Sequence, residues 1–339
     1  MSEAGEAVGP VAAEAAAAAR RPRRRAPGRS VFWLLPVLAL PVPLLLNPYV
    51  QFVVNLILVY VLVGVGFNIV IGNLGQLAFA NVAFFGLGAY ASGILTVHAG
   101  WPWWTTVLPA GIVGALAGVL ASLPALRRIR LFYLAILTMA FGELMRWIYI
   151  RAEPLTHGSM GLAVPPPVLL GVRLGTDRQK FYVFLALAVV VVVLTASLLR
   201  SRFGRAFMAI RDNEIAAAAM GIPTGRYFVL AFAWGGFVVG IGGAMYTALI
   251  GHVTPEAFNL LELILHFAIV MVGGLASLAG SVIGAIVLTT TPELFRDFPG
   301  FQELVLATLI ILVLLFLPRG LVSLLAAWWP VFGERYYRE

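Results

Sequence analysis

The chain contains no cysteine, which excludes disulfide bonds, thiolate zinc sites and cysteine nucleophiles. Lysine is almost as scarce, because Lys180 is the only one. No G-x-x-x-x-G-K-[ST] phosphate-binding loop is present, so the chain lacks this common nucleotide-binding motif. No apolar stretch carries a nucleophile beside its base or a complete set of metal ligands. We therefore predict no catalytic residues, no metal site and no cofactor bound by this chain.

Charged residues are also few. They make up 11% of the 339 residues, whereas soluble domains contain about 25%. Hydrophobic residues reach 61% and the mean hydropathy is +0.96, which indicates an integral membrane protein. The net charge of +8 does not favour nucleic acid, because the basic residues form short clusters beside apolar runs, where they contact anionic lipid headgroups.

Apolar runs long enough to cross a hydrocarbon core of about 30 Å follow one another along the chain. We expect helices, because a helix satisfies its own backbone polar groups in lipid. The predicted spans are Tyr49–Ile71, Leu77–His98, Trp103–Leu123, Leu131–Ile150, Phe181–Leu199, Tyr227–Ile250 and Gln302–Leu317. The predicted fold is all-α, a polytopic transmembrane bundle of about eight to ten spans that include a broken or re-entrant pair.

The two ends of the chain differ from this pattern. Residues 1–30 are rich in Ala and Arg and predict a disordered basic tail. The Pro-broken apolar run Val31–Leu46 has no small-x-small cleavage site before Asn47, so we interpret it as an uncleaved first helix rather than a signal peptide. The predicted membrane domain is then 31–325, with a short C-terminal tail at 326–339.

Arginine placement predicts the orientation of the bundle. The N-terminal tail, the loop around Arg127, the loop 200–226 and the C-terminal end hold most of the basic residues, so both termini are predicted to be cytoplasmic. The basic residues left outside are Arg151, Arg173, Arg178, Lys180 and Arg296.

The stretch Asn259–Thr291 must then cross the membrane twice or not at all, yet it is too short for two full spans. The glycines Gly273, Gly274 and Gly280 interrupt its centre and predict a turn near Ala276. Two short helices, a re-entrant pair and one long tilted helix all remain open at this point. Small residues also recur at helix-contact spacing, which predicts close helix packing. These pairs are Gly114 with Gly118, Gly236 with Gly240, and Gly280 with Gly284.

A polar island, AIRDNEIAAAAMGIP, interrupts the apolar pattern at Ala209–Pro223. Asp212 or Asn213 is placed to cap a helix of about two turns, with Ile215, Ala218 or Ala219, and Ile222 on one apolar face. Such a helix is too short to be stable alone in water and persists only when held at both ends or packed into a partner. An ordinary connecting helix on the membrane surface is the alternative.

This island resembles the coupling loop of ABC importer permeases, in the form found in the branched-chain amino-acid permeases of the LivM type. The resemblance extends over roughly Tyr49–Leu325 and includes GNLGQLAFANVAFFGLGAYASGIL, FYLAILTMAFGELMR, SRFGRAFMAIRDNE, MVGGLASLAGSVIGA and LFLPRGLV. It implies a permease subunit of a prokaryotic inner membrane that translocates small amino acids by alternating access.

The resemblance also implies partners and coupling residues. The partners would be a second homologous permease, two cytoplasmic ATPases that hold ATP and Mg, and an extracytoplasmic binding protein. The positions that match the coupling loop are Arg211, Asp212, Glu214, Ala217 and Gly221. The chain departs from the family at Ala78, Asn81 and His157, so urea and short amides stay open beside Leu, Ile and Val as substrates.

Intramembrane polar residues are costly and usually face the bundle interior. Asn68, Asn73, Gln76 and Asn81 are candidates for the substrate pathway, and hydrogen bonding between helices is the alternative. Glu143 and Arg146 are spaced for a local ion pair. Glu262 and His266, at i and i+4, are spaced for a structural pair or a proton relay, and the relay leaves a proton-coupled secondary transporter as the alternative function.

Overall fold

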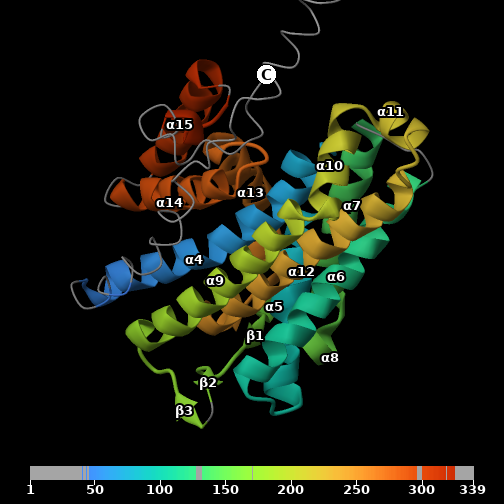
Figure 1. Ribbon diagram of the computed structural model, residues 1–339. Helices are drawn as coiled ribbons and strands as arrows, with labels where there is room; N and C mark the ends of the chain where they lie inside the picture. The colour runs from blue at the N-terminus through green and yellow to red at the C-terminus, as the bar shows by residue number, and fades with distance from the viewer. Residues whose placement is uncertain are drawn as a thin grey trace, which may run out of the picture.

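The computed structural model describes residues 46–126, 132–169, 171–295, 300–317 and 319–324, with the isolated positions 40 and 43. These residues form a bundle of helices with two small antiparallel sheets (Figure 1). The helices are α4 (Pro48–Asn68), α5 (Asn81–His98), α6 (Trp103–Leu126), α7 (Phe132–Arg151), α8 (Glu153–Thr156), α9 (Asp177–Arg200), α10 (Arg202–Asp212), α11 (Glu214–Ala219), α12 (Thr224–Ile250), α13 (Leu260–Gly273), α14 (Leu278–Leu294) and α15 (Phe301–Phe316), with a π-helical turn η3 (Ile69–Asn73) and 3-10 turns η4 (Gly158–Met160) and η5 (Pro255–Phe258). The strands are β1 (Leu162–Ala163), β2 (Val168–Leu169), β3 (Val172–Arg173) and β4 (His252–Val253), paired β1 with β4 and β2 with β3.

The predicted all-α, multi-pass fold is confirmed. Helices α6, α7, α9, α12 and the continuous pair α4–η3 are each long and apolar enough to cross a membrane, and α13, α14 and α15 are shorter apolar helices. The predicted tails 1–30 and 326–339, and nearly all of the predicted first span, lie outside the described residues. The cytoplasmic placement of both termini stays a prediction.

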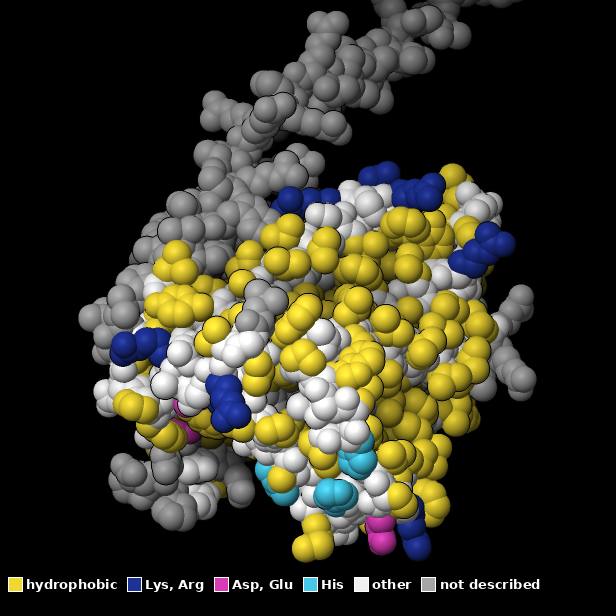
Figure 2. Space-filling view, turned by 90° about the horizontal axis from the view of Figure 1, so that it is seen from below, with side chains coloured by type: hydrophobic (Ala, Val, Ile, Leu, Met, Phe, Trp, Pro, Cys, Tyr) yellow, Lys and Arg dark blue, Asp and Glu magenta, His cyan; other side chains and the backbone are white. Residues whose placement is uncertain are grey.

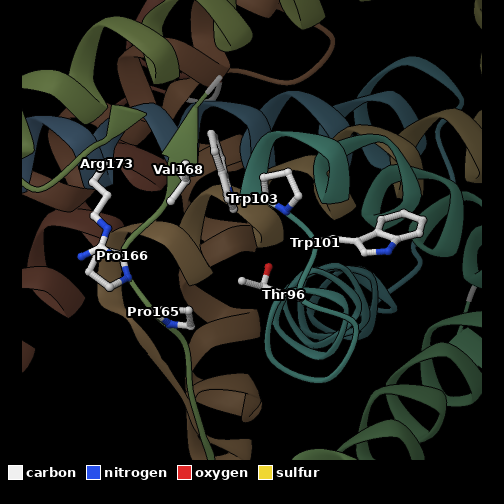
Figure 3. A pocket seen from close by; sticks show the side chains of 9 residues that line it. Thr96, Trp101, Trp103, Pro165, Pro166, Val168 and Arg173 are labelled. Carbon is white, nitrogen blue, oxygen red and sulfur yellow. The ribbon is translucent and has the colours of Figure 1, made fainter. Parts of the chain in front are cut away.

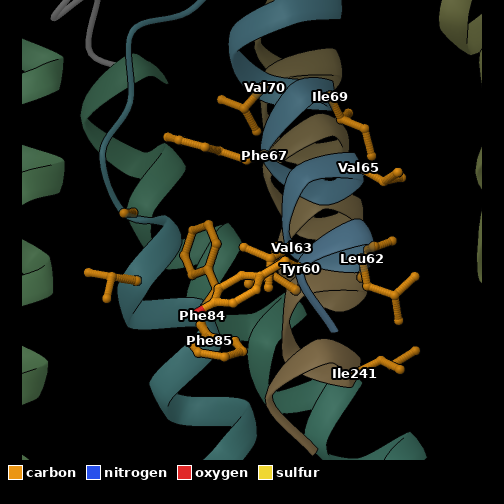
Figure 4. Close-up of a cluster of buried hydrophobic side chains, with 14 of the residues drawn as sticks. Tyr60, Leu62, Val63, Val65, Phe67, Ile69, Val70, Phe84, Phe85 and Ile241 are labelled. Atoms are coloured by element: carbon orange, nitrogen blue, oxygen red, sulfur yellow. The ribbon is translucent and has the colours of Figure 1, made fainter. Parts of the chain in front are cut away.

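Helices α4 and α12 form the centre of the bundle. Their most apolar windows are 78% and 72% buried, whereas the corresponding window of α7 is only 28% buried. Aromatic side chains from α4 and α5, such as Tyr60, Phe84 and Phe85, fill the space between these helices (Figure 4). Hydrophobic side chains also dominate the exterior face seen in Figure 2, where Lys and Arg lie mostly toward the margins. An apolar exterior is what lipid requires of a membrane-spanning bundle.

Glycines bring α6 and α12 together. A side chain on Gly114 would collide with the backbone carbonyl of Gly236, and one on Gly236 would collide with the carbonyl of Gly114. Gly118 and Gly240 continue the same interface, against the backbones of Phe232 and Ala110 respectively. Two of the small-residue pairs found in the sequence therefore pack against each other, which allows the close backbone approach that stabilises helix pairs in lipid.

The predicted span Leu77–His98 is too long at its start, because α5 begins at Asn81. Gly75 turns the chain with a φ of +74°, a left-handed conformation that glycine adopts freely. The backbone N–H of Phe79 then donates to Thr138 Oγ1 of α7 at 2.7 Å. This anchored, non-helical segment 74–80 replaces the first turn that hydropathy alone predicted.

The segment 259–291 contains two helices, α13 and α14, rather than one tilted helix. Each helix begins with a side-chain cap: Asn259 accepts from the N–H of Glu262 at 3.0 Å, and Ser277 Oγ accepts from the N–H of Gly280 at 3.0 Å. Between them Ala276 has a φ of +58°, an uncommon conformation for a residue with a Cβ. The two helices pack against each other where Gly284 meets Ile269 and Gly273.

Candidate functional site

The positions that match the coupling loop lie at one end of the bundle, in α10, in α11 and just after α11. Figure 1 shows this end opposite the one that carries β2 and β3. Asn213 separates the two helices and caps α11, since its Oδ1 accepts from the N–H groups of Ile215 and Ala216, both at 3.0 Å. Of the two capping candidates in the sequence, Asn213 is the one that caps.

The short helix expected after a cap at Asp212 or Asn213 is α11, and the residues of the island before it, up to Asp212, complete the separate helix α10. Most of the expected apolar face is exposed on the outside of the bundle. In the six-residue α11, Ala217 is the buried residue, whereas Ile215 is 75% exposed and Met220, just after the helix, is 84% exposed. Only one side of this short helix packs against the bundle. The rest of its apolar surface is not buried by any other part of the described chain.

The five predicted coupling positions have different surroundings. Arg211 lies in the last turn of α10, Glu214 in the first turn of α11, and Ala217 against the bundle. Gly221 follows α11 with a φ of +83°, which ends the helix as its position in the sequence suggested. Asp212 is exposed at the end of α10.

Arg211 connects this end of the bundle to α4. Its Nη1 donates to the carbonyl oxygen of Gly72 at 2.8 Å, within the π-helical turn η3. Its aliphatic stem lies against Gly75, where an added Cβ would come within 2.7 Å of Arg211 Cγ. The last turn of α10 and the end of α4 are therefore in direct contact.

Asn68 connects α4 to the turn between α13 and α14. Its Oδ1 accepts from the N–H of Ala276 at 2.8 Å, and its Nδ2 donates to Ser277 O and Ser281 Oγ, both at 2.9 Å. The side chain is 1% exposed. This carboxamide supplies the partners that the left-handed turn at Ala276 needs at membrane depth.

The C-terminal part of the described chain closes the other side of this turn. The N–H of Leu321 donates to Val272 O at 2.8 Å. A Cβ on Gly274, whose φ is +131°, would come within 2.6 Å of Val322 Cγ1. Gly273 packs against Gly280 across the turn. The three glycines named from the sequence therefore lie where two backbones meet.

The four pathway candidates do not form one polar cluster, and among the described residues no hydrogen bond joins any two of them. Asn68 and Asn81 are buried and bonded to other helices, Asn73 is 3% exposed, and Gln76 is half-buried in the segment 74–80. For Asn68, the contacts are those of a residue that joins helices.

Asn81 belongs to a chain of hydrogen bonds that crosses three helices. Its Nδ2 lies 3.2 Å from His266 Nδ1 of α13, and His266 Nε2 lies 3.1 Å from Glu262 Oε1. Glu262 Oε1 also accepts from Tyr60 Oη of α4 at 2.9 Å. His266 is fully buried, so the i, i+4 pair seen in the sequence is part of a satisfied interior network. No pattern in the sequence indicated that Tyr60 would join this network.

A cavity of about 440 Å³ lies near β2 and β3, at the end opposite α11. It is lined by Thr96, Gly100, Trp101, Pro102, Trp103, Pro165, Pro166, Val168 and Arg173 (Figure 3). In the part of the chain that the structure describes, no group of three or more His, Asp or Glu side chains is arranged to hold a metal ion.

Replacing Asn68 by Leu is expected to destabilise the fold, because the N–H of Ala276 and Ser281 Oγ would lose a buried partner. Leaving buried polar groups unpaired costs about 1–3 kcal/mol each. Thermal unfolding in detergent, followed by tryptophan fluorescence, measures the loss. Asn47→Leu is the control, since Asn47 is exposed before α4 and makes no side-chain cap. Equal midpoints for the two variants would show that the Asn68 bonds contribute nothing.

Comparison with known proteins gives a consistent picture. Residues 49–317 match the family model described as the permease component of the branched-chain amino acid transport system. The chain is 32% identical over 312 residues to the high-affinity branched-chain amino acid transport system permease protein LivM of Escherichia coli, covering 85% of this chain and 73% of that protein. It is 25% identical to LivH of the same organism, covering 78% and 91% respectively. A shorter match, 31% identical over 136 residues, is to the xylose transport system permease protein XylH.

Proposed function

We propose a transport mechanism for this chain, which belongs to the family of branched-chain amino acid transport system permease components and is a multi-pass, membrane-spanning subunit of an importer. Its substrates are branched-chain or other small amino acids, with related small amides such as urea as the wider class. It lies in a prokaryotic inner membrane and works by alternating access.

Four partners complete the proposed assembly: a second homologous permease, two cytoplasmic ATP-binding subunits and an extracytoplasmic substrate-binding protein. The similarity to both LivM and LivH, two permease proteins of Escherichia coli, supports a pair of different permeases. ATP and Mg belong to the ATP-binding subunits, because this chain has no phosphate-binding loop.

The exposed apolar surface of α11 is the observation that carries this proposal. Ile215 and Met220 project from the same end of the bundle that holds Arg211 and Arg205. An exposed apolar tip rimmed by polar residues is typical of a protein docking site. We propose that an ATP-binding subunit covers it.

Motion of α11 has a physical route into the membrane. Asn213 joins α11 to α10, Arg211 joins α10 to Gly72, and Asn68, one turn earlier in α4, joins the turn between α13 and α14. ATP-driven closure of the motor would move this connected set as a unit and change which side of the bundle is open.

The hydrogen-bonded chain from Tyr60 to Asn81 is what a proton-coupled transporter would use. The residue at one end of this chain argues against proton coupling, because the Asn81 carboxamide neither accepts nor releases a proton near neutral pH. A relay that ends on an amide does not connect two aqueous sides. The network fits a structural role better.

Reconstitution in proteoliposomes tests the proposed function. The complete assembly should concentrate leucine when ATP is enclosed, and an uncoupler should leave the initial rate unchanged. The chain alone should concentrate nothing. Accumulation by the chain alone, driven by a proton gradient and abolished by the uncoupler, would replace the ABC importer with the secondary transporter.

A further inference from the structure

Helix α7 is the least buried of the candidate membrane spans. Its most apolar window has a mean hydropathy of 1.2, the lowest among these spans, and only 28% of that window is buried. The exposed residues recur every three or four positions and form one stripe along the helix, which includes Ile136, Ala140, Glu143 and Trp147. This stripe is available to lipid, to another subunit or to water.

The stripe carries a charged pair in the second half of the 20-residue helix, with Glu143 near the middle and Arg146 about one turn closer to the C-terminal end. Arg146 Nε lies 3.5 Å from Glu143 Oε2, and the two side chains are 32% and 54% exposed. Among the described residues neither side chain has another hydrogen-bond or ion-pair partner. The contact is long for a charge-assisted bond, so both groups keep free donor and acceptor capacity.

Lipid is a poor neighbour for this pair. Charged side chains at mid-bilayer are costly and almost always face the bundle interior or a water-filled cavity. By contrast, the exposed mid-span residues of α6, such as Leu116 and Leu120, are purely apolar. The exposed face of α6 is therefore suited to lipid, whereas the exposed face of α7 is not.

Non-helical backbone lies against the buried face of the same helix, the face that carries Thr138 and Gly142. Thr138 of α7 bonds Phe79 of the segment 74–80, and Gly142 packs against Val82 at the start of α5. The contact between Gly142 and Val82 puts the start of α5 level with the middle of α7. At such depth, irregular backbone is tolerated where it is buried in protein or lines a cavity. Gln76 of this segment is half-buried.

We propose that the exposed stripe of α7 lines the water-filled translocation path and that Glu143 and Arg146 contact the substrate in transit. Glu143 receives the ammonium group and Arg146 the carboxylate of a zwitterionic amino acid, and the apolar residues of the stripe meet its side chain. The assignment rests on the proposed transport function and narrows its substrates to zwitterions. A neutral amide has no charged group to pair with Glu143 or Arg146.

The absence of cysteine makes a direct test available, since any introduced cysteine is the only thiol in this chain, and the same assembly with the unsubstituted chain gives the background reaction of the other subunits. Ala140→Cys and Glu143→Cys are placed in the assembled importer in nanodiscs, with Leu116→Cys as the lipid-facing control. Leu116 is 59% exposed, similar to Glu143. A charged methanethiosulfonate reagent attacks only thiolates, which form in water and not in lipid.

Both α7 positions should react at least about tenfold faster than Leu116→Cys, and leucine bound during turnover should slow the reaction. Reaction as slow as at the control would overturn the path assignment. Fast reaction that leucine leaves unchanged would overturn the substrate contact. Failure of the wild-type assembly to show ATP-driven uptake would instead refute the proposed function, so the two failures are distinguishable.

Neutral polar variants test the charges themselves. Glu143→Gln and Arg146→Gln should each lower leucine uptake at least about tenfold, as the loss of a charged contact would, while the assembly keeps its ATP-binding subunits. Glu153→Gln, an exposed carboxylate on α8, is the control. Uptake at the wild-type rate in both α7 variants would refute the role of the pair.

Discussion

Replacing Met220 by Asp is expected to abolish ATP-driven uptake while the chain remains folded. Met220 is 84% exposed beside the buried Ala217, so the change removes no contact within the described bundle. On the proposed docking surface, however, the new carboxylate would be buried without a partner. Losing a central apolar contact of this kind costs about 2–4 kcal/mol in protein interfaces, which corresponds to a weakening of about 30-fold to 900-fold. Co-purification of the ATP-binding subunits and ATP-dependent uptake in proteoliposomes measure the effect.

The chain offers a matched control for this substitution. Met160 is also 84% exposed, but it belongs to η4, near the end of the bundle that carries the small sheets. Met160→Asp should leave the ATP-binding subunits attached. Ile215→Asp and Glu214→Arg should behave as Met220→Asp does, because both alter α11. Unchanged uptake in all three α11 variants would remove the docking site from α11.

The sequence predicted the helices of this fold well because their signals are local. The run Trp103–Leu123 corresponds to α6, which begins at the same residue and ends at Leu126. The run Phe181–Leu199 lies within α9. Apolar length and a polar boundary are enough to locate such helices. The start of α5 was misplaced because the backbone anchor from Phe79 to Thr138 involves a residue 59 positions away, which hydropathy does not detect.

The contacts of the candidate site, like the anchor of Phe79, join residues that are far apart in the sequence. Arg211 and Gly72 are 139 residues apart in sequence, and Tyr60 and Glu262 are 202 apart. Which side chains meet depends on the rotation and depth of each helix, and neither is encoded in a single apolar run. The sequence pointed to Arg211, Asn68 and Asn81 as important residues. Their hydrogen-bond partners could be identified only from the three-dimensional arrangement of the helices.

The same distinction applies to the glycine pairs. Their spacing in α6 and in α12 predicted close packing in each helix, yet it did not predict that Gly114 and Gly236 face each other. Small residues at this spacing are compatible with many partners. The mutual contact makes both positions intolerant of a side chain, and this intolerance can be measured.

Replacing Gly114 by Val is expected to prevent α6 from packing on α12. Each glycine lies against the backbone carbonyl of the other, so a side chain meets main chain that has no rotamer with which to move away. Overpacking within a well-packed core costs about 1–3 kcal/mol, and more where backbone must shift, as it must here. Because α12 is the centre of the bundle, its displacement disturbs α4 and α5 as well. We expect little monodisperse protein and a thermal midpoint well below that of the wild type.

Gly175→Val provides the control for this substitution, because no atom lies within 4 Å of the position where its Cβ would be. Gly236→Val should reproduce the effect of Gly114→Val from the other side of the interface. The double variant should cost less than the sum of the two single variants, since one displacement of the helices relieves both collisions. If Gly114→Val instead unfolds at the temperature of the Gly175→Val control, close backbone contact at this level does not hold α6 and α12 together. The bundle must then tolerate a wider spacing between these two helices.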